Sequence, residues 1–290
     1  MKTAVLVPVY NAEKFLPRCL ESLSAQTSGA YAAIFVDDGS TDASRTLLDR
    51  FAEGRPGTIV DTIPNGGVSA ARNRGLELAL ADPEVDSVLF LDSDDRLFPE
   101  CIGSARRFLA EAPSAIHAWR FTDDGGGAYS TDTAVWCRLY PRSALADVRF
   151  FTGSDVAEDI AFNLEVAHRH HASVIGHEAV LYHYTSNAGS TMHRELTARD
   201  FEMRSALIEY LVRVYGDDDA ALDRLCRSEI PDLLKQFWRH LRRVRKPERP
   251  AAAEIFRSEL ESLDDRGLLK PRAGGFKELK YFLRFKWMAR

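Results

Sequence analysis

Three aspartates stand within four positions at the end of an apolar run. In the stretch FLDSDD, Phe90 and Leu91 lead directly into Asp92, Asp94 and Asp95. Carboxylates gathered at a buried strand end repel one another, so a cation must neutralise them or their pKa values rise. Mg²⁺ prefers oxygen ligands, takes one or two carboxylates and leaves positions for phosphate and water. The spacing therefore predicts a site for Mg²⁺ or Mn²⁺ with a diphosphate, and the structural alternative is a solvated, Asp-rich loop.

The elements that must position these residues follow from the pattern of the first hundred positions. Short apolar runs alternate there with stripes of helical period, and the runs predict strands buried on both faces. The expected strands are residues 4–9, 32–36, 58–63 and 87–91, and the expected helices are residues 12–26, 42–51 and 68–80. This alternation indicates βαβ units and a mainly parallel sheet. Ligands of such sheets bind beyond the carboxyl ends of the strands, where VYN (9–11), DDGSTD (37–42) and DSDD (92–95) stand.

The second part of the chain has a different pattern. DDGGG at 123–127 predicts a turn between two strands, followed by a strand at 134–140, a helix at 159–170 and one or two strands at 173–184. From residue 195 onward the pattern is helical to the end. KPERP at 246–250 indicates a linker or a helix boundary.

Composition narrows the classes of protein that fit. The chain has 290 residues, of which 45% are hydrophobic and 28% charged, as in a globular protein with one large or two smaller domains. Its net charge of -5 gives no reason to expect nucleic-acid binding. The cysteines lie far apart without zinc or redox spacing, so we expect reduced, packed thiols. No stretch reaches the ~18 apolar residues of a membrane-spanning helix. The first apolar run is typical of a strand rather than a signal peptide. We therefore expect a cytoplasmic protein.

A series of motifs carries a resemblance to a known family. VPVYN, VDDGSTD, NGGVSAARNRG and FLDSDD occur in this order, and WCRLYPR, AEDIAFNLEV and LYHYTSNAGSTMH follow them. Together they resemble the family 2 glycosyltransferases with the GT-A fold, over roughly residues 2–193. The resemblance implies an α/β fold, with a Rossmann-like, mainly parallel mixed sheet flanked by helices and a helical C-terminal extension. It implies a catalytic domain at 1–193, with a nucleotide-sugar half (1–100) and an acceptor half (101–193), and a helical region at 194–290.

The resemblance also implies an activity and a nucleotide-sugar site. Members move a sugar from a nucleotide-diphosphate sugar, here expected to be a UDP-sugar, to an acceptor hydroxyl and invert the anomeric carbon. The acceptor would lie on a glycan, a lipid-linked saccharide or a cell-surface polymer. Tyr10 would stack on the base, and Asp38 rather than Asp37 would accept a hydrogen bond from the base. Arg72 would direct its charge toward the nucleotide. The full donor set is Pro8, Tyr10, Asn11, Asp37, Asp38, Arg72, Asp92, Ser190 and Thr191.

The same resemblance assigns the metal and the general base. Asp94 would bind Mn²⁺ or Mg²⁺ directly, with Asp92 on ribose or a metal-bound water. Asp95 stays open as a ligand, because the doubled aspartate permits a shift of one residue. Asp159 would be the base, while Glu158 and Trp136 would lie on the acceptor side. The structural alternative for Glu158–Asp159 is an acidic first helical turn favoured by the macrodipole.

The chain departs from the family pattern at Thr185, near which many members have an arginine. The missing charge can come from His183, His193 or Arg194, or it can be absent. That departure keeps a second reading open, namely a pseudoenzyme that binds sugar nucleotides without turnover. A third reading is a phosphohydrolase of the haloacid-dehalogenase type, which also ends a strand in Asp-x-Asp. That family has Thr or Val where this chain has Arg96, and it leaves the other motifs unexplained.

Basic residues gather in the C-terminal region. RHLRRVRK at 239–246 and FKELKYFLRFKWMAR at 276–290 combine cations with apolar side chains, as interfacial amphipathic helices do. These segments predict peripheral contact with anionic lipid at the inner face of the cell membrane. The alternative is a basic helix packed on the body of the protein or in an oligomer interface.

Overall fold

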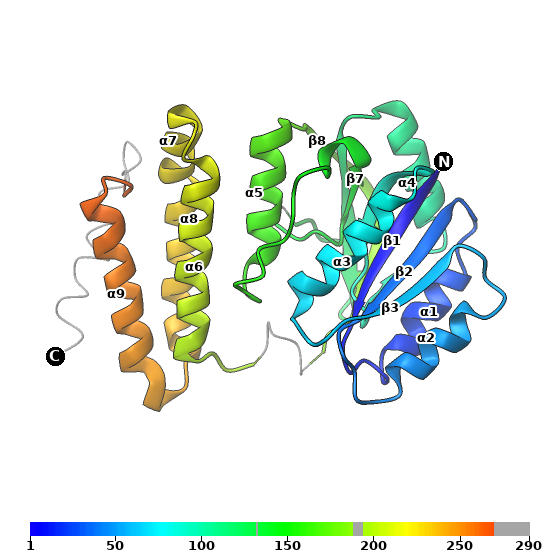
Figure 1. Cartoon of the computed structure of the whole chain (residues 1–290), viewed down its shortest axis with the longest axis horizontal. Coiled ribbons are helices and arrows are strands. Elements are labelled where there is room, and N and C mark those ends of the chain that lie inside the picture. Colours follow the sequence, from blue (N-terminus) through cyan, green and yellow to red (C-terminus); the bar gives the residue numbers. More distant parts are fainter. Residues whose placement is uncertain (132, 188–193, 270–290) are drawn as a thin grey trace. The chain divides into compact units, whose positions relative to one another are not determined.

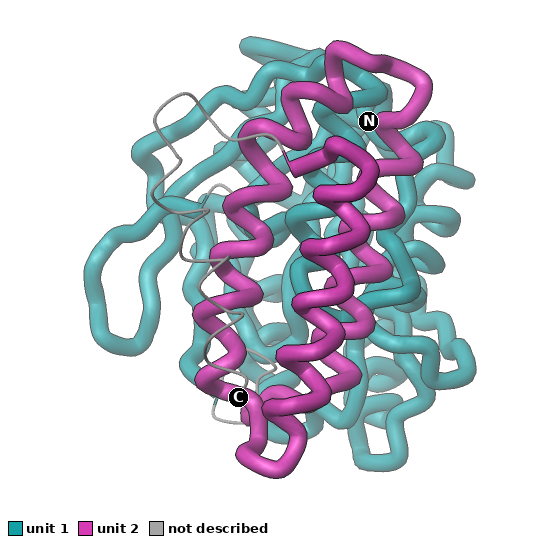
Figure 2. The backbone as a smooth tube through the Cα atoms, turned by 90° about the vertical axis from the view of Figure 1, so that its left-hand side faces the viewer, with its two compact units in different colours: residues 1–188 teal, residues 189–290 magenta. Residues whose placement is uncertain are grey.

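The computed structural model describes residues 1–131, 133–187 and 194–269. The predicted donor residues Ser190 and Thr191, and the basic segment at 276–290, lie outside the described residues. Internal contacts divide the chain into two compact units, Met1–Ala188 and Gly189–Arg290, which Figure 2 colours separately. We call them the sheet unit and the helical unit.

The first half of the sheet unit is a parallel βαβ arrangement. Strand β1 lies between β2 and β4, and β3 pairs with the outer side of β2. The strands are β1 (Lys2–Val9), β2 (Tyr31–Asp37), β3 (Thr58–Thr62) and β4 (Val85–Phe90). The register pairs Val9 with Asp37 and Leu6 with Phe90, so the carboxyl ends of the three central strands meet at one edge. The expected strands are therefore confirmed, and their polar extensions share this edge.

The second half of the sheet mixes directions. Among the described residues the sheet has eight strands in the order β3-β2-β1-β4-β7-β6-β8-β5, with β7 antiparallel to β4 and β6, and β8 parallel to β6. The added strands are β5 (Arg96–Leu97), β6 (Ile116–Asp123), β7 (Arg138–Pro141) and β8 (Val174–Tyr184). The strand expected at 134–140 is shorter than predicted, because β7 begins at Arg138. The strand expected directly after the turn at 124–127 is only an isolated bridge, in which Tyr129 pairs with Phe121. The result is the α/β mixed sheet that the sequence predicts.

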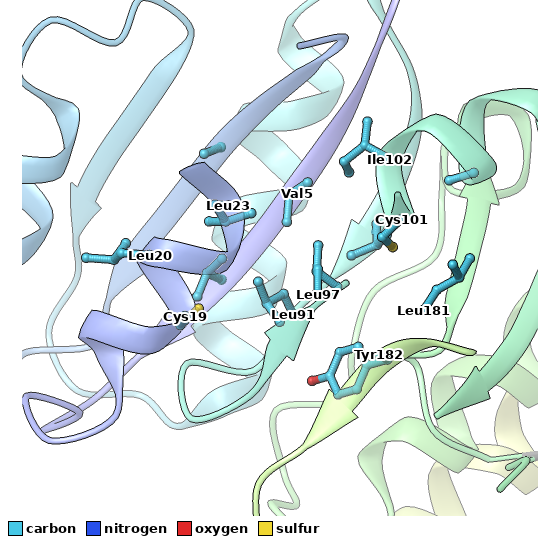
Figure 3. Packing of buried hydrophobic residues seen from close by; sticks show 14 of the residues in the cluster. Val5, Cys19, Leu20, Leu23, Leu91, Leu97, Cys101, Ile102, Leu181 and Tyr182 are labelled. Atoms are coloured by element: carbon cyan, nitrogen blue, oxygen red, sulfur yellow. The ribbon is translucent and has the colours of Figure 1, made fainter. Parts of the chain in front are cut away.

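Helices cover both faces of this sheet (Figure 1). One face packs on α1 (Leu16–Ser24), α2 (Ser44–Ala52) and α4 (Cys101–Glu111), and the other on α3 (Val68–Ala81) and α5 (Glu158–His170). Figure 3 shows part of the first core, in which Leu91, Leu97 and Tyr182 lie together. All four cysteines are buried and free, as expected. Buried strands between two apolar layers fix the register, because a slip would carry their polar ends away from the common edge.

Proline in a central strand needs a local explanation, since it cannot donate to the ladder. Pro8 of β1 pairs with Val36, but β4 ends its pairing with β1 two residues earlier, at Leu6 and Phe90. In a parallel strand alternate residues bond to opposite neighbours. Leu6 accepts from Leu91 on the β4 side, so Pro8 faces the same side, beyond the last β4 pair. Its missing N–H therefore removes no bond from that ladder.

The helical unit contains α6 (Ala198–Tyr215), α7 (Asp219–Arg227), α8 (Glu229–His240) and α9 (Arg249–Asp265). A capping box of Thr197 and Asp200 begins α6. KPERP is the expected helix boundary, because a 3₁₀ turn at Lys246–Glu248 precedes α9. Within the described ranges, no helix is long and apolar enough to cross a membrane. In the basic segment 239–246, Arg239, Arg242, Arg245 and Lys246 are exposed, and its contact with a membrane stays a prediction.

Candidate active site

One buried arginine joins the predicted donor and acceptor residues. Arg72 lies in α3 with only 3% of its surface exposed. Its Nη2 donates to Asp92 at 2.9 Å, and its Nη1 donates to Glu158 at 3.0 Å and to Asp159 at 2.7 Å. The two halves of the predicted site therefore meet at one guanidinium. We expected Arg72 to point toward the nucleotide, and its described bonds go instead to these three carboxylates.

The charges in this cluster are strongly coupled. Burial alone would lower the pKa of Arg72, but Asp159, Asp92 and Glu158 raise it, so the guanidinium keeps its proton. Burial, reinforced by the charge of Asp159, raises the pKa of Glu158 to about 7. Burial also raises the pKa of Asp159, against the opposing effect of Arg72. A carboxylate whose pKa is raised binds a proton more readily, which a general base requires.

A strained residue sets the direction of the acidic pair. Glu158 and Asp159 are the first residues of α5, and the preceding Ala157 has a left-handed backbone with φ 63°. That conformation is costly for alanine and persists only where surrounding contacts impose it. Asp159 provides two of them, because one of its oxygens bonds to Arg72 and the other accepts from the backbone N–H of Val135 at 3.1 Å. The side chain of Asp159 is thus held on both sides.

The aspartates of the stretch 92–95 have different surroundings. Asp95 is 1% exposed, and its two oxygens accept from the Tyr182 hydroxyl at 2.6 Å and the Thr185 N–H at 2.7 Å. Asp94 is less buried, and one of its oxygens accepts from the amide of Asn187 at 3.2 Å. This geometry favours Asp94 over Asp95 as a metal ligand. Both assignments stay predictions.

The donor set fits a small divalent cation. Burial, reinforced by the neighbouring charge of Asp92, raises the pKa of Asp94, so negative charge there lacks compensation. Carboxylate oxygens are the ligands that Mg²⁺ and Mn²⁺ prefer. Across the described parts of the chain, no group of three or more acidic, histidine or cysteine side chains is arranged to hold a metal ion. Asp94 with Asp92 would supply the one or two carboxylates that Mg²⁺ usually takes, and a diphosphate and water would supply its remaining ligands.

The loop at the end of β2 is tied to the end of β3 and to the segment that precedes α3. Both oxygens of Asp38 accept backbone N–H groups, from Gly66 at 2.8 Å and Gly67 at 2.9 Å. Burial raises the pKa of Asp38 and these two bonds oppose the rise. Asp37 accepts from the N–H of Ser40 at 3.0 Å and from the Thr62 hydroxyl. Both aspartates therefore shape the pocket loops, and contact of Asp38 with a base stays a prediction.

The remaining loop residues present one exposed ring. Asn11 has a positive φ of 47°, and its side chain accepts from the N–H of Thr41 at 2.8 Å. Tyr10 beside it is 52% exposed, and Pro8 is partly buried. An exposed aromatic ring at the carboxyl edge of the sheet is available for stacking on a planar base.

The acceptor-side Trp136 belongs to an aromatic cluster. Its ring stacks on Tyr182, with centroids 4.5 Å apart, and on Tyr184 at 5.9 Å, and it meets Phe121 edge-on at 4.9 Å. The sequence patterns did not single out Tyr182, although Tyr182 and Tyr184 flank His183 in the YHY motif. The period of two in a strand was the available signal, because it puts the two tyrosines on one face.

The pKa of His183 bears on whether this residue can supply the charge missing near Thr185. Burial, followed by the charge of Arg96, lowers that pKa, which disfavours a charged imidazole. Arg96, which sequence reasoning used only to weigh another family, lies 2.9 Å from the His183 ring. Arg194 of the helical unit bonds to Asp200, and His193 lies outside the described residues.

Residues 4–171 match the family described as Glycosyl transferase family 2. The chain belongs to this family. Among its relatives is the uncharacterized glycosyltransferase YibD of Escherichia coli K12, which is 40% identical over 98 residues, or 34% of this chain and 27% of that protein. The putative glycosyltransferase EpsH of Bacillus subtilis 168 is 29% identical over 236 residues, or 71% of this chain and 67% of that protein. The chain spans only 16% and 18% of two further curated relatives.

A solved structure has the same fold. Residues 1–349 of Staphylococcus aureus TarS, in complex with UDP-GlcNAc, superpose with a TM-score of 0.72 at 22% identity, covering 92% of this chain and 82% of that one. The likeness shows that the sheet has the expected GT-A fold. The family match leaves the phosphohydrolase reading without support.

Proposed function

We propose that the protein is an inverting, hexosyltransferase-type glycosyltransferase that takes a sugar from a nucleotide-diphosphate sugar. The contacts of Arg72 carry the proposal. They bring Asp92 of the stretch 92–95, which we call the diphosphate loop, and Asp159 of the acceptor side within bonding distance of one guanidinium. A transferase needs this proximity, because the leaving group and the attacking hydroxyl act on the same anomeric carbon.

Each residue has a role in the transfer. Asp159 accepts the proton of the acceptor hydroxyl as the new bond forms at the anomeric carbon. The bond from that carbon to the diphosphate oxygen breaks, and the electron pair leaves with the nucleoside diphosphate. A divalent cation held by Asp94 and Asp92 would stabilise the charge on this leaving group. Arg72 keeps Glu158 and Asp159 oriented, and Trp136 supports the acceptor side.

The relatives favour a UDP-sugar donor and a cell-surface acceptor. TarS has been solved with UDP and with UDP-GlcNAc, and a Bacillus spizizenii relative is named poly(ribitol-phosphate) beta-glucosyltransferase. We therefore infer that this chain takes a UDP-hexose and glycosylates a hydroxyl of a cell-envelope polymer or a lipid-linked saccharide. Tyr10 and Asp38 would recognise the uracil, by stacking and by accepting its N–H.

Replacement of the proposed base tests this function. UDP release from UDP-glucose and UDP-N-acetylglucosamine is measured with water as the acceptor, beside calorimetry of UDP binding. Asp159→Asn keeps the size and the contact to Val135 but removes the base, so turnover should fall by about 10²–10⁴-fold. Its UDP affinity should stay within about threefold of wild type, because the carboxylate meets the acceptor rather than the nucleotide.

The matched control is Glu158→Gln, which changes the neighbouring carboxylate on the same guanidinium. It should lose about tenfold in turnover, since it supports the site without taking the proton. Equal losses in the two variants would refute Asp159 as the base. Binding of UDP without turnover of any donor in the wild type would establish the pseudoenzyme reading instead.

A further inference from the structure

A buried tyrosine joins the diphosphate loop to the end of β8. Tyr182 is fully buried, and its hydroxyl donates to Asp95 Oδ2 at 2.6 Å. The same hydroxyl accepts from the backbone N–H of Asp92 at 3.3 Å. Asp95 Oδ1 accepts from the N–H of Thr185 at 2.7 Å. Two residues of the loop are therefore bonded to two residues at the end of one strand.

The strand pairing makes this junction rigid. Leu97 of β5 pairs with Tyr182 of β8, so Asp95 stands one residue before a hydrogen-bonded ladder. The ring of Tyr182 belongs to the core that contains Leu91 and Leu97, and its hydroxyl points away from Leu181 (Figure 3). The ring of Trp136 stacks on the ring of Tyr182, with centroids 4.5 Å apart. One side chain thus contacts the diphosphate loop and the acceptor-side aromatic cluster.

Hydrogen bonding separates the roles of the two adjacent aspartates. A buried carboxylate is costly unless its oxygens accept hydrogen bonds, and both oxygens of Asp95 do so. Direct binding of Asp95 to a cation would have to compete with these bonds. Asp94 is partly exposed and shares one oxygen with Asn187, so it keeps acceptor capacity toward a ligand.

We propose that Tyr182 and Asp95 are positioning residues, which hold Asp92 and Asp94 in place for the metal and the diphosphate. Asp95 is then an anchor and not a ligand. The inference rests on the proposed function, because it assigns the roles of residues at that site. It adds a residue, Tyr182, which contacts both the diphosphate loop and Trp136.

The first test is Tyr182→Phe, which keeps the ring stacked on Trp136 and removes only the hydroxyl. Calorimetry of UDP binding, with and without Mn²⁺, should show that the Mn²⁺-dependent gain in affinity falls by about tenfold, the loss expected for bonds to a charged group. UDP affinity without Mn²⁺ should be unchanged. The matched control is Tyr140→Phe, because Tyr140 is also fully buried and donates to Asn163 at 2.7 Å, elsewhere on the sheet. It should leave the Mn²⁺-dependent gain unchanged.

Amide hydrogen exchange gives a second readout that needs neither ligand nor metal. Tyr182→Phe removes the acceptor of the Asp92 N–H and one bond to Asp95. Exchange at Asp92 should therefore rise by about tenfold or more, and at Thr185 by less, while Tyr140→Phe should leave both amides as in wild type. Unchanged exchange in Tyr182→Phe overturns the anchor, whether or not the protein binds UDP.

Asp95→Asn distinguishes an anchor from a ligand. Asparagine keeps the size and one acceptor oxygen, so the Mn²⁺-dependent gain should stay within about fivefold of wild type. Its complete loss would show that Asp95 is a metal ligand and would overturn the inference. A wild-type protein that binds no UDP at all would refute the proposed function instead, and the exchange experiment would still decide the anchor.

Discussion

Arg72 illustrates how much one side chain contributes at the scale of the residue. A guanidinium has five donors in a planar fork, so it can bond to several carboxylates at once. Asp92 comes from the end of β4, and Glu158 and Asp159 come from the start of α5. Without the guanidinium, these three carboxylates would repel one another in a buried position. The contacts of Arg72 therefore hold these three carboxylates together, and its contact with a nucleotide stays a prediction.

Replacement of Asp94 tests the metal assignment at the scale of the residue. Asp94→Ala removes the carboxylate that is best placed for a divalent ion. The Mn²⁺-dependent part of UDP affinity should disappear in calorimetry, with a loss of about 1.5–3 kcal/mol. UDP affinity without metal should change little. The same UDP affinity in wild type with and without Mn²⁺ would contradict the metal assignment.

At the scale of the element, the start of α3 depends on glycine. Gly67 stands before the helix with φ 85° and ψ 168°, a conformation that essentially only glycine adopts. Its N–H bonds to Asp38, and a Cβ added there would lie 2.6 Å from Asp155 Oδ1. The helix start and the pocket loop are therefore built around the absence of a side chain.

Gly67→Ala should destabilise the fold by about 1–3 kcal/mol and lower UDP affinity by about tenfold, because the Asp38 turn must move. Thermal unfolding and calorimetry measure the two effects. Gly54→Ala is the control, since Gly54 also has a positive φ, 70°, but no atom lies within 4 Å of its added Cβ. It should lose stability and keep its UDP affinity. A loss of UDP affinity as large in Gly54→Ala would mean that general destabilisation explains both variants.

At the scale of the whole molecule, stability depends on a carboxyl group in the helical unit. Glu259 of α9 is 8% exposed, and burial raises its pKa from 4.5 to about 7. Glu209 adds to this rise, while Ser205 and Arg266 oppose it. The folded chain therefore holds a proton that the unfolded chain releases near pH 4.5. The stabilisation is fully present below that pH and is lost as the pH rises through about 7.

Glu259→Gln cannot ionise, so it should lack this part of the pH dependence. Relative to wild type, we expect similar stability at pH 5 and about 1–2 kcal/mol more at pH 8, measured by chemical denaturation at both values. Glu254→Gln, at an exposed glutamate of the same helix, should follow the wild type. A constant difference between Glu259→Gln and wild type across this range would disprove the role of the ionisation.

Much of the sheet unit could be predicted from the sequence, because its signals are local. Short apolar runs identified β1 to β4, and the motifs at their ends identified the family and the edge that carries the site. The Glu158–Asp159 pair could be found in the same way. The length of β7 could not be predicted in this way. Residues 134–137 have the residue types of a strand, but the ladders with β4 and β6 do not include them.

The sequence by itself determined the fold class, the family and the set of candidate residues, because periodicity and motif order depend on positions close together in the chain. Only the tertiary structure decided how these residues divide the work. Arg72 and Asp159 are 87 positions apart, as are Asp95 and Tyr182, and each pair meets through strand order and register. The hydrogen bonds that a carboxylate accepts leave no mark on the sequence. The adjacent Asp94 and Asp95 therefore look alike as letters and differ only in what surrounds them.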